Sequence, residues 1–182
     1  GLIGPNGSGK STMVNCITGV TRADSVDINL GPLQIHKEHT WQRARAGLGR
    51  TFQNIRLFKN LTVVDNVVVA CVSAGESVKS ADKSALALLN QVGVLHHAYR
   101  FAGELSFGDQ RRVEIARALA LRPSVLLLDE PAAGMNPAES AALLAQFREI
   151  MKRANAGMLL IDHDVTLIRS ACDSLTVLDH GK

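Results

Sequence analysis

Residues Gly4–Ser11 read Gly-Pro-Asn-Gly-Ser-Gly-Lys-Ser, which is the pattern G-x-x-x-x-G-K-[ST], and this stretch decides the fold. Glycines at these spacings let successive backbone N–H groups curl around phosphate oxygens, and a helix that follows directs its positive end at the same charge. The required context is present, because the apolar Leu2-Ile3 precedes the stretch and a helical pattern runs from Ser11 to Thr18. The alternative, a glycine-rich turn that happens to precede Lys-Ser, does not explain this context.

The loop predicts a role for each of its members. The backbone of the loop would wrap the phosphates, Lys10 would reach the terminal ones, Ser11 would ligate Mg²⁺, and Thr12 would add a phosphate contact. The cofactors expected are therefore ATP and Mg²⁺. The residues predicted to bind the nucleotide here are Gly4, Pro5, Asn6, Gly7, Ser8, Gly9, Lys10, Ser11 and Thr12.

An acidic pair follows a second apolar run. Val125–Leu128 is continuous and apolar, as expected for a strand that is buried on both faces, and Asp129 and Glu130 come directly after it. We predict that Asp129 holds the magnesium shell and that Glu130 is the general base for the water that attacks the γ-phosphate. The alternative is a pair of solvent-facing loop residues, which would be the better interpretation if the phosphate-binding loop were absent.

Two further candidates are weaker on the sequence alone. His163 follows the apolar run Met158–Ile161, at the edge of the sheet where ligands collect in open α/β folds, and it could contact the γ-phosphate and the attacking water. A lone histidine is as often structural. Ser106 begins another helix, and with Gly108 and Gln110 it could form a second anion site, or Ser106 could simply cap the helix.

The order of elements predicts an α/β fold with parallel strands and helices on both faces. Strands are expected at 1–3, 125–128, 158–161 and 175–178, and helices at 11–18, 41–46, 106–121, 137–153 and 165–171. Residues 84–91 are expected to be helical, 73–83 a connection, and 20–40 irregular around the turn at Gly31-Pro32. Thr62 is expected to begin a helix, although the valines that follow it would also suit a strand.

These expectations divide the single domain into an α/β nucleotide-binding core, residues 1–53 and 123–182, and an inserted helical lobe, residues 54–122. The 182 residues are sufficient for one such domain. The first strand is short and the last one ends in a turn, so we interpret the chain as part of a longer protein. The five histidines other than His163 are expected at the surface.

Composition excludes several classes. Only 20% of residues are charged, which is unlike a disordered chain, and the longest apolar run, Val67–Val72, is far too short to span a membrane. No secretion leader is evident, and three scattered cysteines favour a reducing compartment over a disulfide framework. The net charge of +3 does not argue for nucleic acid. Two clusters of basic residues are interpreted as solvated faces or protein contacts: Arg43, Arg45, Arg50, Arg56 and Lys59, and then Arg111, Arg112 and Arg117.

Taken together, the motifs resemble those of the ATP-binding subunits of ABC transporters. The ordered set runs through essentially the whole chain: the Walker A loop Gly4–Ser11, a glutamine loop Arg50–Gln53, a signature Leu105–Gln110, a Walker B strand ending at Asp129-Glu130, the segment Ala132–Pro137, and the switch His163. The resemblance implies a P-loop NTPase core of the RecA-like type. Four segments look most like those of the importers of branched-chain amino acids: Arg50–Phe58, Gly108–Arg112, Ala132–Pro137 and Ile161–Val165.

The resemblance also implies partners. Two such subunits would close head to tail around two ATP molecules, with Ser106, Gly108 and Gln110 of one completing the site of the other. Gln53 would sense magnesium and the attacking water, and Asn54–Phe58 would face integral membrane permease subunits, through which a solute-binding protein acts. The subunit would then sit peripherally on the cytoplasmic face of the cell (inner) membrane, with no nucleic acid expected.

Some positions depart from the family's pattern. Phe107 and Asp109 stand where many members carry Gly, and Asn136 stands where many carry Asp. An acid near a γ-phosphate is unfavourable unless it points away. Two other functions stay open: a soluble ABC-type ATPase that acts on ribosomes or DNA, and a module that binds ATP without turnover.

Overall fold

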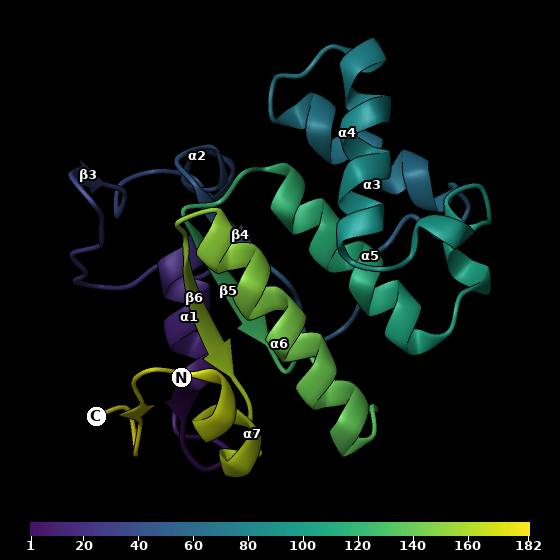
Figure 1. Cartoon of the computed structure of the whole chain (residues 1–182). Coiled ribbons are helices and arrows are strands. Elements are labelled where there is room, and N and C mark those ends of the chain that lie inside the picture. Colours follow the sequence, from purple (N-terminus) through teal and green to yellow (C-terminus); the bar gives the residue numbers. More distant parts are fainter.

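A five-stranded parallel sheet forms the middle layer of the computed structural model, which describes all of residues 1–182 (Figure 1). Its order is β4-β5-β6-β1-β7. The strands are β1 (Leu2–Ile3), β4 (Leu48–Arg50), β5 (Val125–Asp129), β6 (Gly157–Ile161) and β7 (Thr176–Val177). Because the strands are parallel, the loops after β1, β4, β5 and β6 leave from one edge, and these loops carry the predicted site residues.

Helices cover both faces of this sheet, as predicted. Leu127 packs with Leu2 and with Val14 of α1 (Lys10–Thr18) on one face. Leu126 and Leu128 belong to the larger core, which includes Phe147 of α6 (Pro137–Arg153). Successive residues of β5 therefore point into two apolar layers, which explains its continuous apolar sequence. The helix α7 (Val165–Ala171) lies beside α6 (Figure 1).

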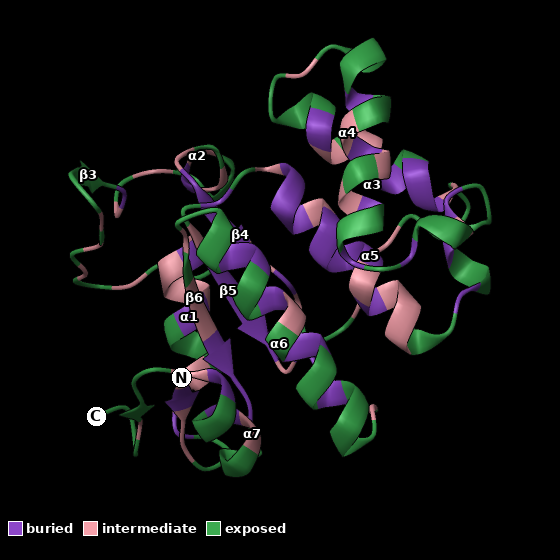
Figure 2. Ribbon diagram, in the orientation of Figure 1, coloured by how far each residue is buried: buried purple, intermediate pink, exposed green.

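The segment between β4 and β5 is helical and stands to one side of the sheet (Figure 1). It contains α3 (Val63–Ser73), α4 (Val78–Gln91), α5 (Phe107–Ala120) and the short 3₁₀ helices η1 (Leu95–His97) and η2 (Ala102–Glu104). We call residues 54–122 the helical lobe. Its helices pack against one another through buried side chains and present exposed outer faces (Figure 2). None of the helices in the structure combines the length and apolar character that crossing a membrane requires.

The remaining elements are small. The helix α2 (Thr40–Arg45) precedes β4, within one residue of its predicted start and end. A two-stranded hairpin, β2 (Asn29–Leu30) and β3 (Leu33–Gln34), lies in the segment expected to be irregular, and it turns at the predicted Gly31-Pro32. Thr62 begins α3 by accepting a hydrogen bond from the amide of Asp65, so the helical alternative for this valine-rich segment is confirmed.

Other expectations were wrong. Residues 73–83 are not a plain connection, because the hydroxyl of Ser77 caps α4 and the helix begins at Val78. Strand β4 had not been predicted, since Leu48-Gly-Arg50 lacks an apolar run and becomes a strand only by pairing with β5. The clustered arginines are also not all on the surface. Arg43 is 5% exposed and donates to the carbonyls of Cys16, Ile17, His36 and Glu38.

The histidines other than His163 are also not all at the surface. His39, His96 and His180 are exposed as expected, whereas His36 and His97 are half-buried. The Nδ1 atom of His36 lies 3.3 Å from the carboxylate of Asp27, and Nε2 of His97 lies 3.6 Å from that of Asp109. The second of these contacts bears on the start of α5.

Candidate active site

A small polar cavity of about 240 Å³ lies at the carboxyl edge of the sheet. It joins the loop after β1 to residues that follow β4 and β5, which are distant in sequence. Its lining residues are Asn6, Gly7, Ser8, Gly9, Lys10, Ser11, Thr12, Gln53, Asp129, Glu130 and Ile161. The fold therefore brings together nine of the predicted nucleotide and metal residues and one predicted catalytic acid.

The start of α1 suits an anion. Gly9 stands at its N-cap with φ 102°, and no side chain caps the helix. Gly7 also has a positive φ of 81°, which a side chain would disfavour. The first amides of an uncapped helix have no partner within the helix, and here they border the cavity. The hydroxyl of Ser8 is buried and has no hydrogen-bond partner. These unpaired donors are the groups that phosphate oxygens satisfy.

Lys10 is folded over the same loop. Its Nζ donates to the carbonyl of Gly4 at 2.7 Å and to that of Pro5 at 3.0 Å. Gly4 and Pro5 therefore do not line the cavity but hold the ammonium at its rim. A Cβ at Gly4 would collide with the carbonyl of Leu178, so this position is closed to other residues.

Asp129 ends β5 and is 7% exposed. Burial raises the pKa of its carboxyl, and the guanidinium of Arg50 opposes this by holding the charged form. The Nη2 atom of Arg50 lies 3.7 Å from Oδ2 of Asp129, and Nη1 donates to Asn15 and Thr18 of α1. Arg50 thus connects α1 to Asp129. Its position in the sequence did not predict this role.

The backbone and the side chain of Glu130 are each fixed by a hydrogen bond. It has a positive φ of 46°, which is unusual for a residue other than glycine, and its amide donates to the carbonyl of Ile161 at 2.8 Å. Strained backbone of this kind concentrates at functional sites. The amide of Gln53 donates to the carboxylate of Glu130 at 3.2 Å. Nδ1 of His163 lies 3.7 Å from the same carboxylate, with the imidazole 75% exposed.

The predicted second anion site is not part of this cavity. Ser106, at the start of α5, accepts from the amide of Asp109 and donates its hydroxyl proton to the Asp109 carboxylate at 2.7 Å. The Gln110 side chain turns back to the carbonyl of Leu105 at 2.9 Å. Gly108 lies near Met135, whose methyl would be 3.5 Å from a Cβ there. In the single chain, this helix start is satisfied from within.

The donor set fits magnesium bound partly through a nucleotide. Nowhere in the 182 residues do three His, Cys, Asp or Glu side chains gather as a metal cluster. Mg²⁺ in phosphate-transfer sites needs only one or two protein oxygens in addition to phosphate and water. Ser11 and Asp129, with the amide oxygen of Gln53, supply oxygen ligands on the walls of one cavity. The chemistry of these residues therefore matches the ion without a dedicated cage.

A parallel sheet with this loop at its carboxyl edge, a buried acid at the end of β5, which β6 separates from β1, and a second acid beside it defines an ATP-binding protein of the P-loop type. Comparison with known proteins agrees. The family model described as ABC transporter matches residues 1–133. The chain belongs to the ABC transporter ATP-binding family, and it is an ABC-type ATPase.

Three relatives illustrate the likeness. The chain is 40% identical to the high-affinity branched-chain amino acid transport ATP-binding protein LivG of Escherichia coli, over 99% of this chain and 76% of that protein. It is 36% identical to the methionine import ATP-binding protein MetN of Rhizobium etli, over 100% of this chain and 51% of that protein. A crystal structure of a nucleotide-free ABC transporter ATP-binding cassette superposes with a TM-score of 0.87 at 30% identity, covering 99% of this chain and 76% of that one.

Proposed function

We propose that this chain is the ATP-hydrolysing subunit that powers an importer of branched-chain amino acids. The observation that carries the proposal is the shared cavity of the phosphate-binding loop, Gln53, Asp129 and Glu130. The likeness to LivG supports the choice of solute, and the likeness to MetN names methionine as the competing one.

In the proposed site, the loop amides and Lys10 bind the triphosphate, and Ser11 and Asp129 hold Mg²⁺, with Gln53 at its shell. Bound magnesium would neutralise charge on the phosphates. Glu130 accepts a proton from the attacking water. Two neighbours orient the Glu130 carboxylate: the side-chain amide of Gln53, at 3.2 Å, and the imidazole of His163, at 3.7 Å. The exposure of His163 leaves it accessible to a γ-phosphate and to a second subunit.

We infer that two subunits are required, with Ser106, Gly108 and Gln110 of one facing the phosphates of the other. Support comes from the geometry of α5, whose start lies outside the cavity of its own chain. For such a contact, the Ser106 hydroxyl has to leave Asp109, and the Gln110 side chain has to leave Leu105. We also propose that the helical lobe, residues 54–122, moves against the core, residues 1–53 and 123–182, when the dimer closes.

The segment after Gln53 supports docking to permease subunits. A groove of about 450 Å³ lies between this segment, α3 and α5. Its basic rim consists of arginines stacked on phenylalanines: Arg56 lies 4.2 Å from the Phe52 ring and Arg117 4.9 Å from the Phe58 ring. A cytoplasmic segment of a permease with an apolar face and an acidic residue would match this rim in shape and charge. The subunit would then be a peripheral protein of the inner membrane face.

The test is transport by the assembled complex. The full-length subunit is reconstituted in vesicles with its permease and solute-binding partners, and ATP-dependent uptake of leucine, isoleucine, valine and methionine is compared. We expect uptake of the three branched-chain solutes at least about tenfold above methionine. Uptake of methionine alone would refute the choice of solute. ATP-independent uptake, or absence of ATP hydrolysis in the complete complex, would refute the proposed role as the engine.

A further inference from the structure

Arg111 is a charged side chain with no exposed surface, and it is the fifth residue of α5, the helix whose start we place against a second subunit. Burial of a guanidinium is costly unless several acceptors surround it. The proposed function uses neither Arg111 nor its partner Glu114, which is 5% exposed. Their burial therefore calls for an explanation in terms of what they hold.

The guanidinium of Arg111 is directed at the glutamine loop. Its Nη1 donates to the carbonyl of Phe52 at 2.5 Å and to Oε2 of Glu114 at 2.6 Å, and its Nη2 donates to the carbonyl of Gln53 at 2.8 Å. The planar fork of an arginine can address two successive carbonyls and a carboxylate at once, which a lysine cannot. One side chain of α5 thus holds the carbonyls of the two peptide units that flank Gln53.

Glu114 completes the grip from the next turn of the same helix. Its Oε1 accepts the amide of Phe52 at 3.3 Å while Oε2 accepts from Arg111. Burial raises the pKa of Glu114, and the charge of Arg111 opposes that shift. We call Arg111 and Glu114 the α5 clamp. The clamp binds one amide and two carbonyls of the glutamine loop, and therefore fixes its orientation as well as its position.

The clamped residue is the one that reaches the proposed base. The side chain of Gln53 donates to the carboxylate of Glu130 at 3.2 Å, and its own carbonyl is held by Arg111. We propose that the α5 clamp is a positioning device that sets Gln53 against Glu130 and ties that placement to the helix that begins at Ser106. A change at the start of α5 is then transmitted through the helix to the catalytic cavity. This inference rests on the proposed function of Gln53 and Glu130.

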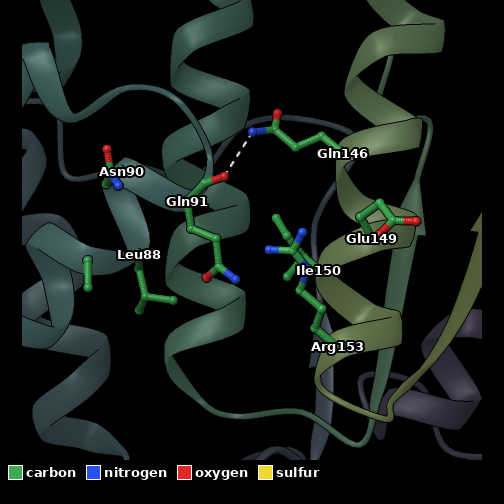
Figure 3. Close-up of a pocket in the computed structure, with 8 residues that line it drawn as sticks. Leu88, Asn90, Gln91, Gln146, Glu149, Ile150 and Arg153 are labelled. Atoms are coloured by element: carbon green, nitrogen blue, oxygen red, sulfur yellow. Dashed lines mark hydrogen bonds between the residues drawn. The ribbon is translucent and has the colours of Figure 1, made fainter.

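The neighbouring arginine provides a matched control. Arg112 leaves α5 on a different face from Arg111, and its Nη1 donates to the carbonyl of Val92 at 3.1 Å and to Oε1 of Gln146 at 2.7 Å. Gln146 in turn donates to the carbonyl of Gln91, across a cleft of about 550 Å³ between α4 and α6 (Figure 3). Arg112 therefore joins the helical lobe to the core without touching the glutamine loop.

The experiment compares Arg111→Lys and Arg112→Lys in the full-length subunit, each with and without Gln53→Ala. Lysine keeps the charge beside Glu114, so the fold is expected to survive, but it loses the paired carbonyl contacts. We expect Arg111→Lys to lower kcat about tenfold with the KM for Mg-ATP within twofold, since small displacements of catalytic groups are costly. Arg112→Lys is expected to leave kcat within twofold at a comparable loss of thermal stability.

The decisive result is the double variant. If Arg111 acts through Gln53, Arg111→Lys lowers kcat no further than about twofold once Gln53 is alanine. The same tenfold loss in both backgrounds would overturn the clamp while leaving the proposed function intact. Full activity of Gln53→Ala alone would instead remove Gln53 from its proposed role, and the clamp with it.

A second measurement is independent of turnover. Hydrogen exchange of the Phe52 amide, which donates to Glu114, is expected to accelerate at least tenfold in Arg111→Lys and to stay unchanged in Arg112→Lys. Unchanged exchange at this amide in Arg111→Lys would contradict the clamp even if activity falls.

Discussion

Two helix starts in this chain are predicted to bind phosphate, yet they differ in how their donors are satisfied. At α1, Gly9 provides no cap, Ser8 has an unpartnered hydroxyl, and Lys10 is held at the rim by backbone carbonyls. At α5, Ser106 is bonded both to the amide and to the carboxylate of Asp109. The first start has free donors in the single chain, whereas the second would have to lose the contact between Ser106 and Asp109 before it could bind the phosphate that we propose for it.

The difference teaches that a capping motif and a ligand site can share one sequence. A serine followed by a glycine and a helix can cap that helix or bind an anion, and the contacts around the serine determine which of the two it does. Asp109 contributes a negative charge that favours the helix start but repels a phosphate. We therefore expect nucleotide binding by one chain to depend on α1, and dimer formation to depend on α5.

The largest expected effect comes from stopping hydrolysis, because in the proposed dimer this would keep both helix starts on one nucleotide for long enough to measure. Glu130→Gln in the full-length subunit should slow ATP hydrolysis at least about 10²-fold while ATP affinity stays within a fewfold. The glutamine keeps the size of the side chain but cannot accept the proton of the attacking water. Steady-state kinetics and equilibrium binding measure the two quantities. Undiminished turnover would remove Glu130 from its role.

A substitution of Ser106 tests the difference between the two helix starts most directly. In the Glu130→Gln background, ATP should drive dimerisation, and adding Ser106→Ala should weaken the ATP-dependent dimer about tenfold while nucleotide affinity of the monomer changes less than twofold. A hydroxyl contact to a charged group is worth about 1.5–3 kcal/mol, which is consistent with this loss. Analytical ultracentrifugation measures the dimer. Monomer alone at saturating ATP would contradict the role of α5 between subunits.

A smaller effect of opposite sign is expected at Asp109. Asp109→Asn removes the carboxylate that holds the Ser106 hydroxyl and that would face phosphate, so the ATP-dependent dimer should tighten about threefold to tenfold. The backbone amide of residue 109 can still donate to the hydroxyl of Ser106, which caps α5, so the fold is expected to stay comparable. Sedimentation of the Glu130→Gln/Asp109→Asn protein provides the measurement. A weaker dimer would show that Asp109 supports the contact and does not compete with it.

The smallest expected effect concerns thermal stability. It depends on Asp129, which lines the same cavity as the start of α1. Burial raises the pKa of the Asp129 carboxyl above its value in the unfolded chain, so the folded chain binds the proton more tightly. The free energy of unfolding therefore falls as the pH rises from the unfolded pKa to the higher folded pKa. Without nucleotide, Asp129→Asn should therefore melt at a higher temperature than the wild type at pH 8, with the gap narrowing towards pH 4. Equal melting temperatures at both pH values would contradict this.

The parts that sequence predicted well are those that depend on neighbours along the chain. The loop before Lys10 and the helix start at Thr62 are local, and both are present in the structure. The strand Leu48–Arg50 and the clamp residue Arg111 could not be predicted, because each is defined by a partner far away in sequence. Leu48 is paired with Val125, and Arg111 holds Phe52. Helix α4 was missed at its start because Ser77 and Ser80 also suit a loop.

The central claim is that the uncapped start of α1 and Lys10 bind a triphosphate within one chain. Isothermal titration calorimetry of the full-length subunit with Mg-ATP tests it most directly, with Lys10→Ala as the variant. The account predicts saturable binding of one nucleotide per chain, weakened by at least about tenfold in Lys10→Ala. Equal affinity in both proteins, or no binding of Mg-ATP to the wild type, would contradict it.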